Sequence, residues 1–249
     1  PTFGAAKTIE PLHDVNSKSS AVFGQFSIQP DDTLKLTAGF RSTNDEKDAV
    51  GGTKVQIRPP CGGSFCWVNV GSQSYSPEDS WSSGTYRLGI DKYINDDRMV
   101  YASMSTGYRA GGFNFGVSSA ESYDPEELTA FEIGSKNRFN DGRMQLNATV
   151  FYYDYTDMQV FQVVDQTIVI RNASEADISG AELEFVAALS DNLRVDASLG
   201  LLDAEYKKFI LPSNLFLDAA GDPTNIDVSG NRLINAPKWS GHIGAEHDI

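Results

Sequence analysis

The 249-residue sequence is poor in the residues that usually build catalytic or metal-binding sites. It contains only three histidines and two cysteines, and it holds no His-Glu-x-x-His, Cys-x-x-Cys or Gly-x-Ser-x-Gly spacing. The stretch from Gly107 to Gly112 is rich in glycine, but it follows a predicted strand and no helix comes after it, which excludes a phosphate-binding loop. We therefore expect a protein that is not an enzyme and that holds no metal ion or cofactor.

Long apolar runs and basic residues are also scarce. No stretch approaches 18 consecutive apolar residues, which excludes a helical membrane span. A membrane β-strand needs only about ten residues of alternating character, so a low mean hydropathy does not exclude a β-barrel. Lys and Arg number 20 against 34 Asp and Glu, which gives a net charge of −14. This balance disfavours nucleic acid as a partner, because phosphate contacts need clustered basic side chains.

The feature that dominates the sequence is an alternation of apolar and polar residues with a period of two. In residues 33–41 the Leu, Ala and Phe side chains share one strand face, while Lys, Thr, Gly and Arg share the other. We predict an all-β fold, an antiparallel meander of about nine strands in which sequence neighbours pair. The same alternation recurs in residues 22–29, 86–91, 100–109, 131–136, 144–150, 182–189, 193–201 and 239–245.

The predicted connections alternate between short and long. The short turns are rich in Asp, Asn, Gly or Pro and lie at residues 29–32, 95–97, 140–142 and 190–192. The long segments lie at residues 44–81, 110–126 and 207–237, and a tight hairpin is expected near residues 165–166. Short turns at one end and long loops at the other are typical of outer-membrane barrels, whereas a soluble sandwich has no reason to separate them.

Aromatic residues gather where the predicted strands meet the long loops. This position favours a girdle at a membrane interface over the general preference of aromatic residues for strands. The residues are Trp81, Tyr86, Tyr108, Phe113, Phe151, Tyr152, Tyr153, Tyr155, Tyr206 and Trp239.

Five motifs, taken together, resemble the barrel of TonB-dependent outer-membrane receptors. The run from Tyr101 to Asn114 ends in Gly-Tyr-Arg-Ala-Gly-Gly-Phe-Asn, which is similar to a loop entrance of that family. It is followed, in family order and spacing, by residues 123–136, 151–155, 178–184 and 235–239. The resemblance implies that residues 1–249 are a partial barrel domain, about nine strands of a 22-stranded transmembrane barrel. We expect it to be incomplete at both ends, because the N-terminal plug domain and the remaining strands are absent and Pro1 is not preceded by a signal peptide.

The same resemblance implies a function, a location and partners. It predicts TonB-energised uptake of a scarce nutrient across the bacterial outer membrane, with a ferric siderophore as the leading substrate class. The expected partners are outer-membrane lipid, TonB through the missing plug region, and a small chelate or nutrient ligand. Haem is disfavoured, because haem receptors of this family tend to carry a Phe-Arg-Ala-Pro entrance and a loop histidine. Here Arg109 is followed by Ala-Gly-Gly, and the loops between Arg41 and Trp239 hold no histidine.

Other functions remain open on the sequence alone. The same uptake machinery also carries glycans and other organic nutrients. A passive porin would have a constriction loop and no plug. A soluble secreted β-sandwich enzyme or lectin would dissolve without detergent.

Three residues near the predicted loop entrance are candidates for substrate binding. Arg109 and Glu132 face the lumen by strand parity, Asn114 lies in the loop, and an arginine in this position can grip an anionic chelate. The alternative is a lumenal salt bridge or a contact with the plug. Glu182 and Glu184 share one face of a single strand and are expected to be solvated, because a glycosidase pair needs carboxylates on separate elements.

The two cysteines, Cys61 and Cys66, enclose Gly-Gly-Ser-Phe in the longest predicted loop. Two glycines make tight closure easy, and a single nearby pair fits a disulfide in an oxidising compartment. Two free thiols are the alternative, and metal binding would need further ligands that the neighbouring sequence does not offer.

Overall fold

The computed structural model describes residues 7–57, 59–61, 64–115, 120–164, 167–217 and 223–248. All regular structure in these residues is β-strand, and they contain no helix that is long and apolar enough to cross a membrane. The long strands are β1 (Lys7–Asp31), β2 (Leu34–Ile57), β6 (Glu78–Asn95), β7 (Arg98–Arg109), β10 (Glu126–Phe139), β11 (Met144–Val164), β12 (Thr167–Ala188), β13 (Leu193–Leu217) and β15 (Trp239–His247). The short strands are β3 (Pro60–Cys61), β4 (Ser64–Phe65), β5 (Val68–Tyr75), β8 (Gly112–Phe115), β9 (Ala120–Tyr123) and β14 (Pro223–Asp227).

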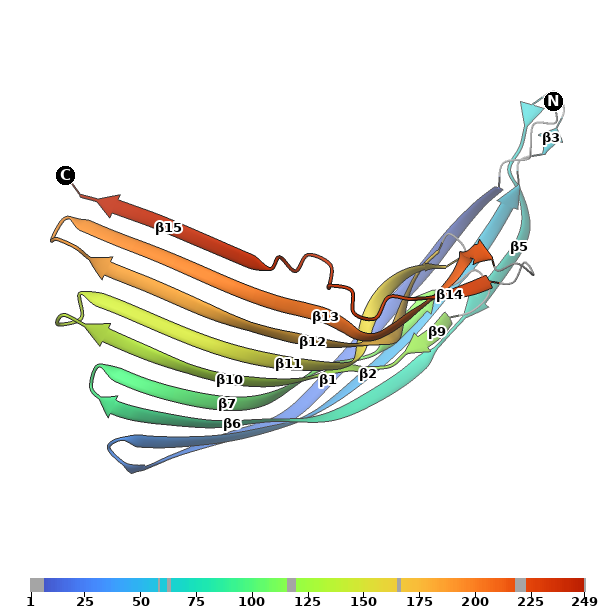
Figure 1. Ribbon diagram of the computed structural model, residues 1–249. Coiled ribbons are helices and arrows are strands. Elements are labelled where there is room, and N and C mark those ends of the chain that lie inside the picture. The colour runs from blue at the N-terminus through green and yellow to red at the C-terminus, as the bar shows by residue number, and fades with distance from the viewer. Residues whose placement is uncertain are drawn as a thin grey trace.

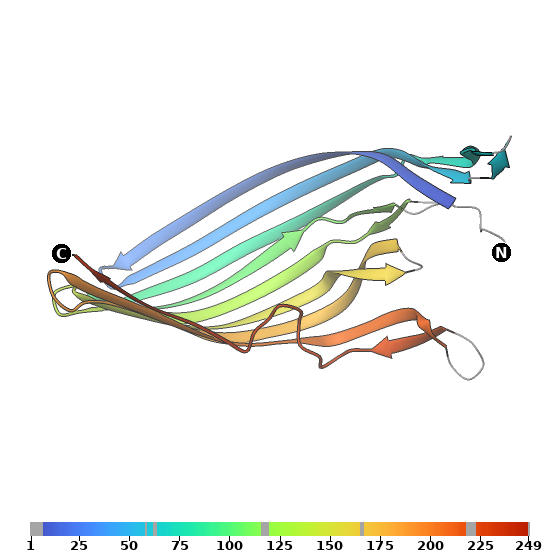
Figure 2. The same ribbon diagram turned by 90° about the horizontal axis from the view of Figure 1, so that it is seen from above.

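One antiparallel sheet of 11 strands contains all the long strands. Its order is β1-β2-β6-β7-β10-β11-β12-β13, with β15 and β14 both paired to β13 and β5 paired to β2. Each long strand therefore pairs with the next long strand along the chain, as the sequence predicts for an antiparallel meander. The sheet is strongly twisted and curved. The strands spread apart at the turn end in Figure 1, whereas they spread apart at the opposite end in Figure 2.

The predicted short turns are confirmed, and they all lie at one end of the sheet (Figure 1). Local chemistry explains their tightness. The Asp31 carboxylate accepts hydrogen bonds from the Thr33 hydroxyl at 2.6 Å and the Thr33 N–H at 2.8 Å, and these bonds hold the pKa of Asp31 below its usual value. The next turn but one places Asn140, Asp141 and Gly142 at positive φ, which these residue types tolerate best.

The opposite end of the sheet, which we call the mouth, carries the three long connections β2–β6, β7–β10 and β13–β15. The prediction that these connections are loops is wrong over much of their length. Strand β2 continues to Ile57, β13 continues to Leu217, and Asp48 still pairs with Glu78. The hairpins extend because pairing provides hydrogen-bond partners for backbone N–H and C=O groups even where the side chains no longer alternate. The hairpin expected near residues 165–166 lies outside the described residues.

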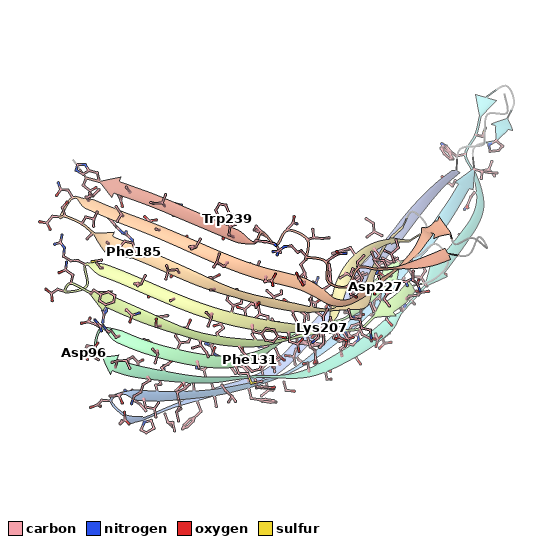
Figure 3. The ribbon with its side chains drawn as sticks, in the orientation of Figure 1. Asp96, Phe131, Phe185, Lys207, Asp227 and Trp239 are labelled. Carbon is pink, nitrogen blue, oxygen red and sulfur yellow. The ribbon has the colours of Figure 1, made fainter. Side chains whose placement is uncertain are left out.

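The register gives the sheet two chemically different faces. Side chains stand on both sides of the strands, with Phe131 and Trp239 among them (Figure 3). On the polar face Ser27, Thr37 and Gly89 lie side by side on adjacent strands. On the apolar face one continuous row crosses all nine long strands: Ile28, Leu36, Ile90, Ala102, Ile133, Val150, Ala181, Leu201 and Trp239.

The apolar face is uncovered in this chain. Phe26 is 67% exposed, Ile133 is 62% exposed and Ile243 is 84% exposed. No large side chain is fully buried among the described residues, so the sheet has no packed core along most of its length. A soluble protein rarely leaves a continuous apolar surface of this kind uncovered. The arrangement therefore fits a sheet whose apolar face meets lipid.

The aromatic girdle predicted from the sequence is only partly correct. Tyr86, Tyr152 and Trp239 lie exposed on the apolar face, as a girdle requires. Tyr108 has the strand parity of the apolar face but is only partly exposed. Six others lie on the polar face or in the mouth, because their strand parity is opposite or because they lie beyond the alternating segments. These are Trp81, Phe113, Phe151, Tyr153, Tyr155 and Tyr206.

Candidate functional site

The candidate site is the mouth, where the glycine-rich run after β7 turns back across the sheet. Gly111 and Gly112 are both buried there. A Cβ atom on Gly111 would come within 2.7 Å of the Trp81 ring and would also collide with the Tyr123 carbonyl oxygen. A Cβ atom on Gly112 would lie 2.5 Å from the Tyr123 hydroxyl. The two glycines are therefore required by close packing, and no positive φ is involved.

A lysine and two aromatic rings hold this turn against β2 and β6. Lys47 donates a hydrogen bond of 2.5 Å to the Gly111 carbonyl oxygen, and its ammonium lies 5.7 Å from the centroid of the Trp81 ring. Trp81 is only 8% exposed and stands 6.3 Å, centroid to centroid, from Phe113. Strands β2 and β6 are thus fastened to the glycine-rich run.

The Asn172 side chain fastens the following segment to β11 and β12. Its amide nitrogen donates to the carbonyl oxygens of Asp124 at 2.6 Å, Asp157 at 2.9 Å and Pro125 at 3.2 Å. Its amide oxygen accepts a hydrogen bond of 2.7 Å from the Asp124 N–H. One side chain therefore joins the β9–β10 connection to the bulge that interrupts β11, where Asp157 has a φ of 52°.

Gln159 makes a second attachment from the same bulge. Its side-chain nitrogen donates to the carbonyl oxygens of Ala110 at 3.0 Å and Asp124 at 3.1 Å. Its backbone N–H donates to the Glu126 carboxylate at 2.7 Å. Gln159 and Asn172 cannot be predicted from the alternation, because both lie beyond the strands that it predicts and their partners come from another loop.

Asn114, one of the predicted substrate-binding residues, is engaged in the same way. Its amide nitrogen donates to the Ile170 carbonyl oxygen at 2.6 Å, and its amide oxygen accepts from the Ile170 N–H at 2.7 Å. This pair of bonds imitates one step of a β-ladder and attaches β8 to β12. In this structure Asn114 therefore positions the loop, and its role in substrate binding stays a prediction.

Arg109 and Glu132 do not lie together. Arg109 is opposite Glu126 and pairs with it at 3.4 Å, although its side chain is 61% exposed. Glu132 lies six residues farther along β10, opposite Ser103, and accepts a hydrogen bond of 3.0 Å from the Tyr153 hydroxyl. Both residues are on the polar face, as strand parity predicts, but each already has a protein partner. Their role in ligand binding also stays a prediction.

Glu182 and Glu184 occupy the positions that the sequence predicts for them. Both are exposed on the polar face of β12, and Glu184 accepts a hydrogen bond of 3.3 Å from Asn147 on β11. Across the described residues, no group of three or more His, Cys, Asp or Glu side chains is arranged to hold a metal ion.

The cysteines lie at the tip of the longest connection. The backbone of Cys61 pairs with Ser64 in the short β3–β4 hairpin, and the Cys66 sulfur is disulfide-bonded. The side chain of Cys61 lies outside the described residues, so the Cys61–Cys66 pairing stays a prediction.

The comparisons with known proteins agree with this architecture. A family model described as "TonB dependent receptor-like, beta-barrel" matches residues 1–248. The chain belongs to this family. The motif that fills the mouth of this TonB-dependent receptor barrel, from Gly107 to Asn114, thus has a physical account: two close-packed glycines, one ion-paired arginine and one asparagine that binds a neighbouring strand.

Relatives of this barrel chain include receptors for metal chelates. The "Probable TonB-dependent siderophore receptor PiuA" of Acinetobacter baumannii is 27% identical over 185 residues, covering 71% of this chain and 24% of PiuA. The "Metal-pseudopaline receptor CntO" of Pseudomonas aeruginosa is 25% identical over 169 residues, covering 68% of this chain and 21% of CntO. The chain therefore spans about a quarter of the length of the curated relatives that it matches.

Solved structures of the family share its backbone. The ferric yersiniabactin uptake receptor FyuA of Yersinia pestis superposes with a TM-score of 0.74 at 17% identity, over 97% of this chain and 33% of FyuA. The siderophore receptor PiuA of A. baumannii superposes with a TM-score of 0.68 at 21% identity, over 94% of this chain and 32% of PiuA. At such identities the superpositions establish the fold alone.

Proposed function

We propose that this chain is part of the wall of an outer-membrane receptor that takes up a ferric siderophore with energy delivered through TonB. The observation that carries the proposal is the uncovered apolar row across nine antiparallel strands, backed by a polar face. In a closed barrel the apolar face would meet lipid, and the polar face would line a lumen that can hold a plug and a hydrophilic ligand. The function needs no catalytic residue.

The edge of the apolar face toward the mouth supports a position in a membrane. Tyr152 lies at this edge, and its hydroxyl donates a hydrogen bond of 2.8 Å to Asp177. Beyond it Lys207 approaches Asp177 at 3.6 Å and Asp154 at 4.0 Å. An aromatic residue followed by charged residues marks the passage from hydrocarbon to water in barrel strands.

The mouth has the mechanical properties that a binding entrance needs. Its loops are attached to neighbouring strands by Lys47, Asn114, Gln159 and Asn172, so their polar surfaces are held in fixed positions. Preorganisation of this kind lowers the entropic cost of binding a bulky ligand. The substrate class is supported by the relatives, whose names specify a siderophore, metal–pseudopaline and ferric yersiniabactin. We therefore favour a ferric siderophore over a glycan, which none of these names specifies.

The test is uptake by cells that carry the intact receptor. We expect radioactive iron supplied as ferric siderophore to accumulate, and accumulation to stop when an uncoupler dissipates the proton gradient. Binding of the same complex to the cell surface should continue. Accumulation that an uncoupler leaves unchanged would contradict TonB-dependent transport and would favour a passive porin.

A further inference from the structure

Two arginines lie together on the polar face, away from the mouth residues described above. Arg41 on β2 is opposite Thr85 on β6, and Arg87 on β6 is opposite Gly39 on β2. The two arginines are therefore diagonal neighbours on the same face, with a separation of about 7–8 Å expected for such positions. Both side chains are exposed.

Neither guanidinium group has an ion-pair partner among the described residues. Within the described part of the chain, Arg41 and Arg87 take part in no ion pair, whereas Arg109 and Arg143 each have a carboxylate partner. The nearest carboxylates on the same face of β2 and β6 are Asp45, four residues from Arg41, and Asp91, four residues from Arg87. Four residues of strand correspond to about 13 Å. In a chain with a net charge of −14, these two adjacent positive charges thus have no carboxylate partner in the part that the structure describes.

The surroundings hold one arginine in place and leave space beside the other. Arg41 donates a hydrogen bond of 2.9 Å from Nε to the Thr43 hydroxyl, and its guanidinium lies 5.7 Å from the centroid of the Phe23 ring. These contacts fix the group while its terminal nitrogens make no hydrogen bond with the described residues. Beside Arg87 stand Gly39 and Gly89, where even an added Cβ atom would meet no atom closer than 3.7 Å.

We propose that Arg41 and Arg87 form a binding site for an anionic oxygen group, a carboxylate or a phosphate, on the polar wall of the barrel. Guanidinium groups are suited to this because their planar N–H donors match the two oxygens of such groups. The proposal rests on the proposed function, since it takes the polar face as the wall along which a transported chelate moves. It adds that the ligand carries an exposed anionic group that these two arginines recognise.

The experiment is titration of the intact purified receptor in detergent with citrate, and separately with inorganic phosphate, by isothermal calorimetry. We expect one saturable site whose affinity falls as salt is raised. Arg87→Gln and Arg41→Gln should each weaken it by about 10-fold to 100-fold, because hydrogen bonds to charged groups contribute on this scale. Arg143→Gln is the matched control, since Arg143 pairs with Asp191 at the turn end of the sheet. It should leave the affinity unchanged, because this ion pair does not lie beside Arg41 or Arg87.

Two results would overturn the proposal. One is the absence of saturable binding of either anion to the unaltered receptor. The other is binding by the Arg41→Gln and Arg87→Gln variants that is as tight as binding by the unaltered receptor. A carboxylate of the protein itself on the two arginines would also overturn a ligand site, and it is recognised by a melting temperature that falls in Arg87→Gln but not in Arg143→Gln. Uptake of ferric siderophore measured in the same cells separates the two proposals. Uncoupler-sensitive uptake without anion binding refutes only the site, whereas uncoupler-insensitive uptake refutes the proposed function.

Discussion

Gly111 shows how closely the mouth is packed at the scale of single residues. A methyl group there would meet both a ring and a backbone carbonyl, and the carbonyl cannot move without breaking β9. We predict that Gly111→Ala destabilises the intact receptor by about 1–3 kcal/mol, the usual cost of overpacking. Urea unfolding of the receptor in lipid vesicles measures the change. Gly24→Ala is the control, because nothing lies within 4 Å of a Cβ atom at Gly24. Equal effects of the two substitutions would show that the mouth tolerates the extra volume.

Asn172 tests whether the mouth depends on a side-chain N–H donor at this position. Three carbonyl oxygens face its amide nitrogen, so Asn172→Asp would place a second acceptor against them. We predict a loss of about 1–3 kcal/mol in local stability, because hydrogen bonds that contribute about 0.5–1.5 kcal/mol each are lost at these partly exposed carbonyl oxygens. Hydrogen exchange at residues 120–126 should become faster. Asn192→Asp, in a turn at the other end of the sheet, should leave exchange in this segment unchanged.

The sequence predicts the face of the sheet on which a side chain lies better than it predicts the ion-pair partner of that side chain. Parity places Arg109, Glu132 and Glu182 on the polar face, and the structure confirms this. Parity cannot show that Arg109 meets Glu126, since that contact depends on the register between β7 and β10. It also cannot distinguish an ion-paired arginine from unpaired ones such as Arg41 and Arg87, because pairing depends on which residue lies opposite.

At the scale of whole strands, the alternation makes a prediction about the two faces. Leu36 lies between Ile28 and Ile90 on the apolar face, whereas the adjacent Thr37 hydroxyl is 3.1 Å from the Ser27 hydroxyl on the polar face. We predict that Leu36→Arg destabilises the intact receptor in vesicles by about 2–4 kcal/mol, the cost of a cation facing the hydrocarbon midplane. Thr37→Arg should cost far less, because water or the plug faces that side. Folding yield and urea unfolding measure both variants.

A third variant separates this interpretation from a soluble sandwich. In a packed core Leu36→Ala would cost about 2–5 kcal/mol through the cavity it leaves. Facing fluid lipid, the same change should be milder, because lipid chains fill the space. If Thr37→Arg proves as damaging as Leu36→Arg, the assignment of the two faces is wrong.

The strands and short turns could be predicted because their causes are local. Apolar alternation and Asp, Asn or Gly at a turn act within a few residues, so the turn at Asp31 and the strand that follows it could be read directly from the sequence. The mouth could not be predicted in the same way. Beyond Thr43 strand β2 continues through charged residues, and only its pairing with β6 shows that it remains a strand.

At the scale of the whole molecule, the faces and the mouth together predict how the receptor lies in a bilayer. Trp239 ends the apolar row on β15 and is 69% exposed. Trp81 lies on the polar face against the glycine-rich run and is 8% exposed. We predict that brominated phospholipid quenches the fluorescence of Trp239 strongly and that of Trp81 hardly at all. The measurement uses intact receptors in which every tryptophan except one is replaced by Phe, and each receptor is inserted into lipid vesicles. A sheet with its faces reversed, or one that packs against protein, would leave Trp239 unquenched. Equal quenching of both residues would mean that lipid reaches the polar face, which a barrel wall with one water-facing side does not allow.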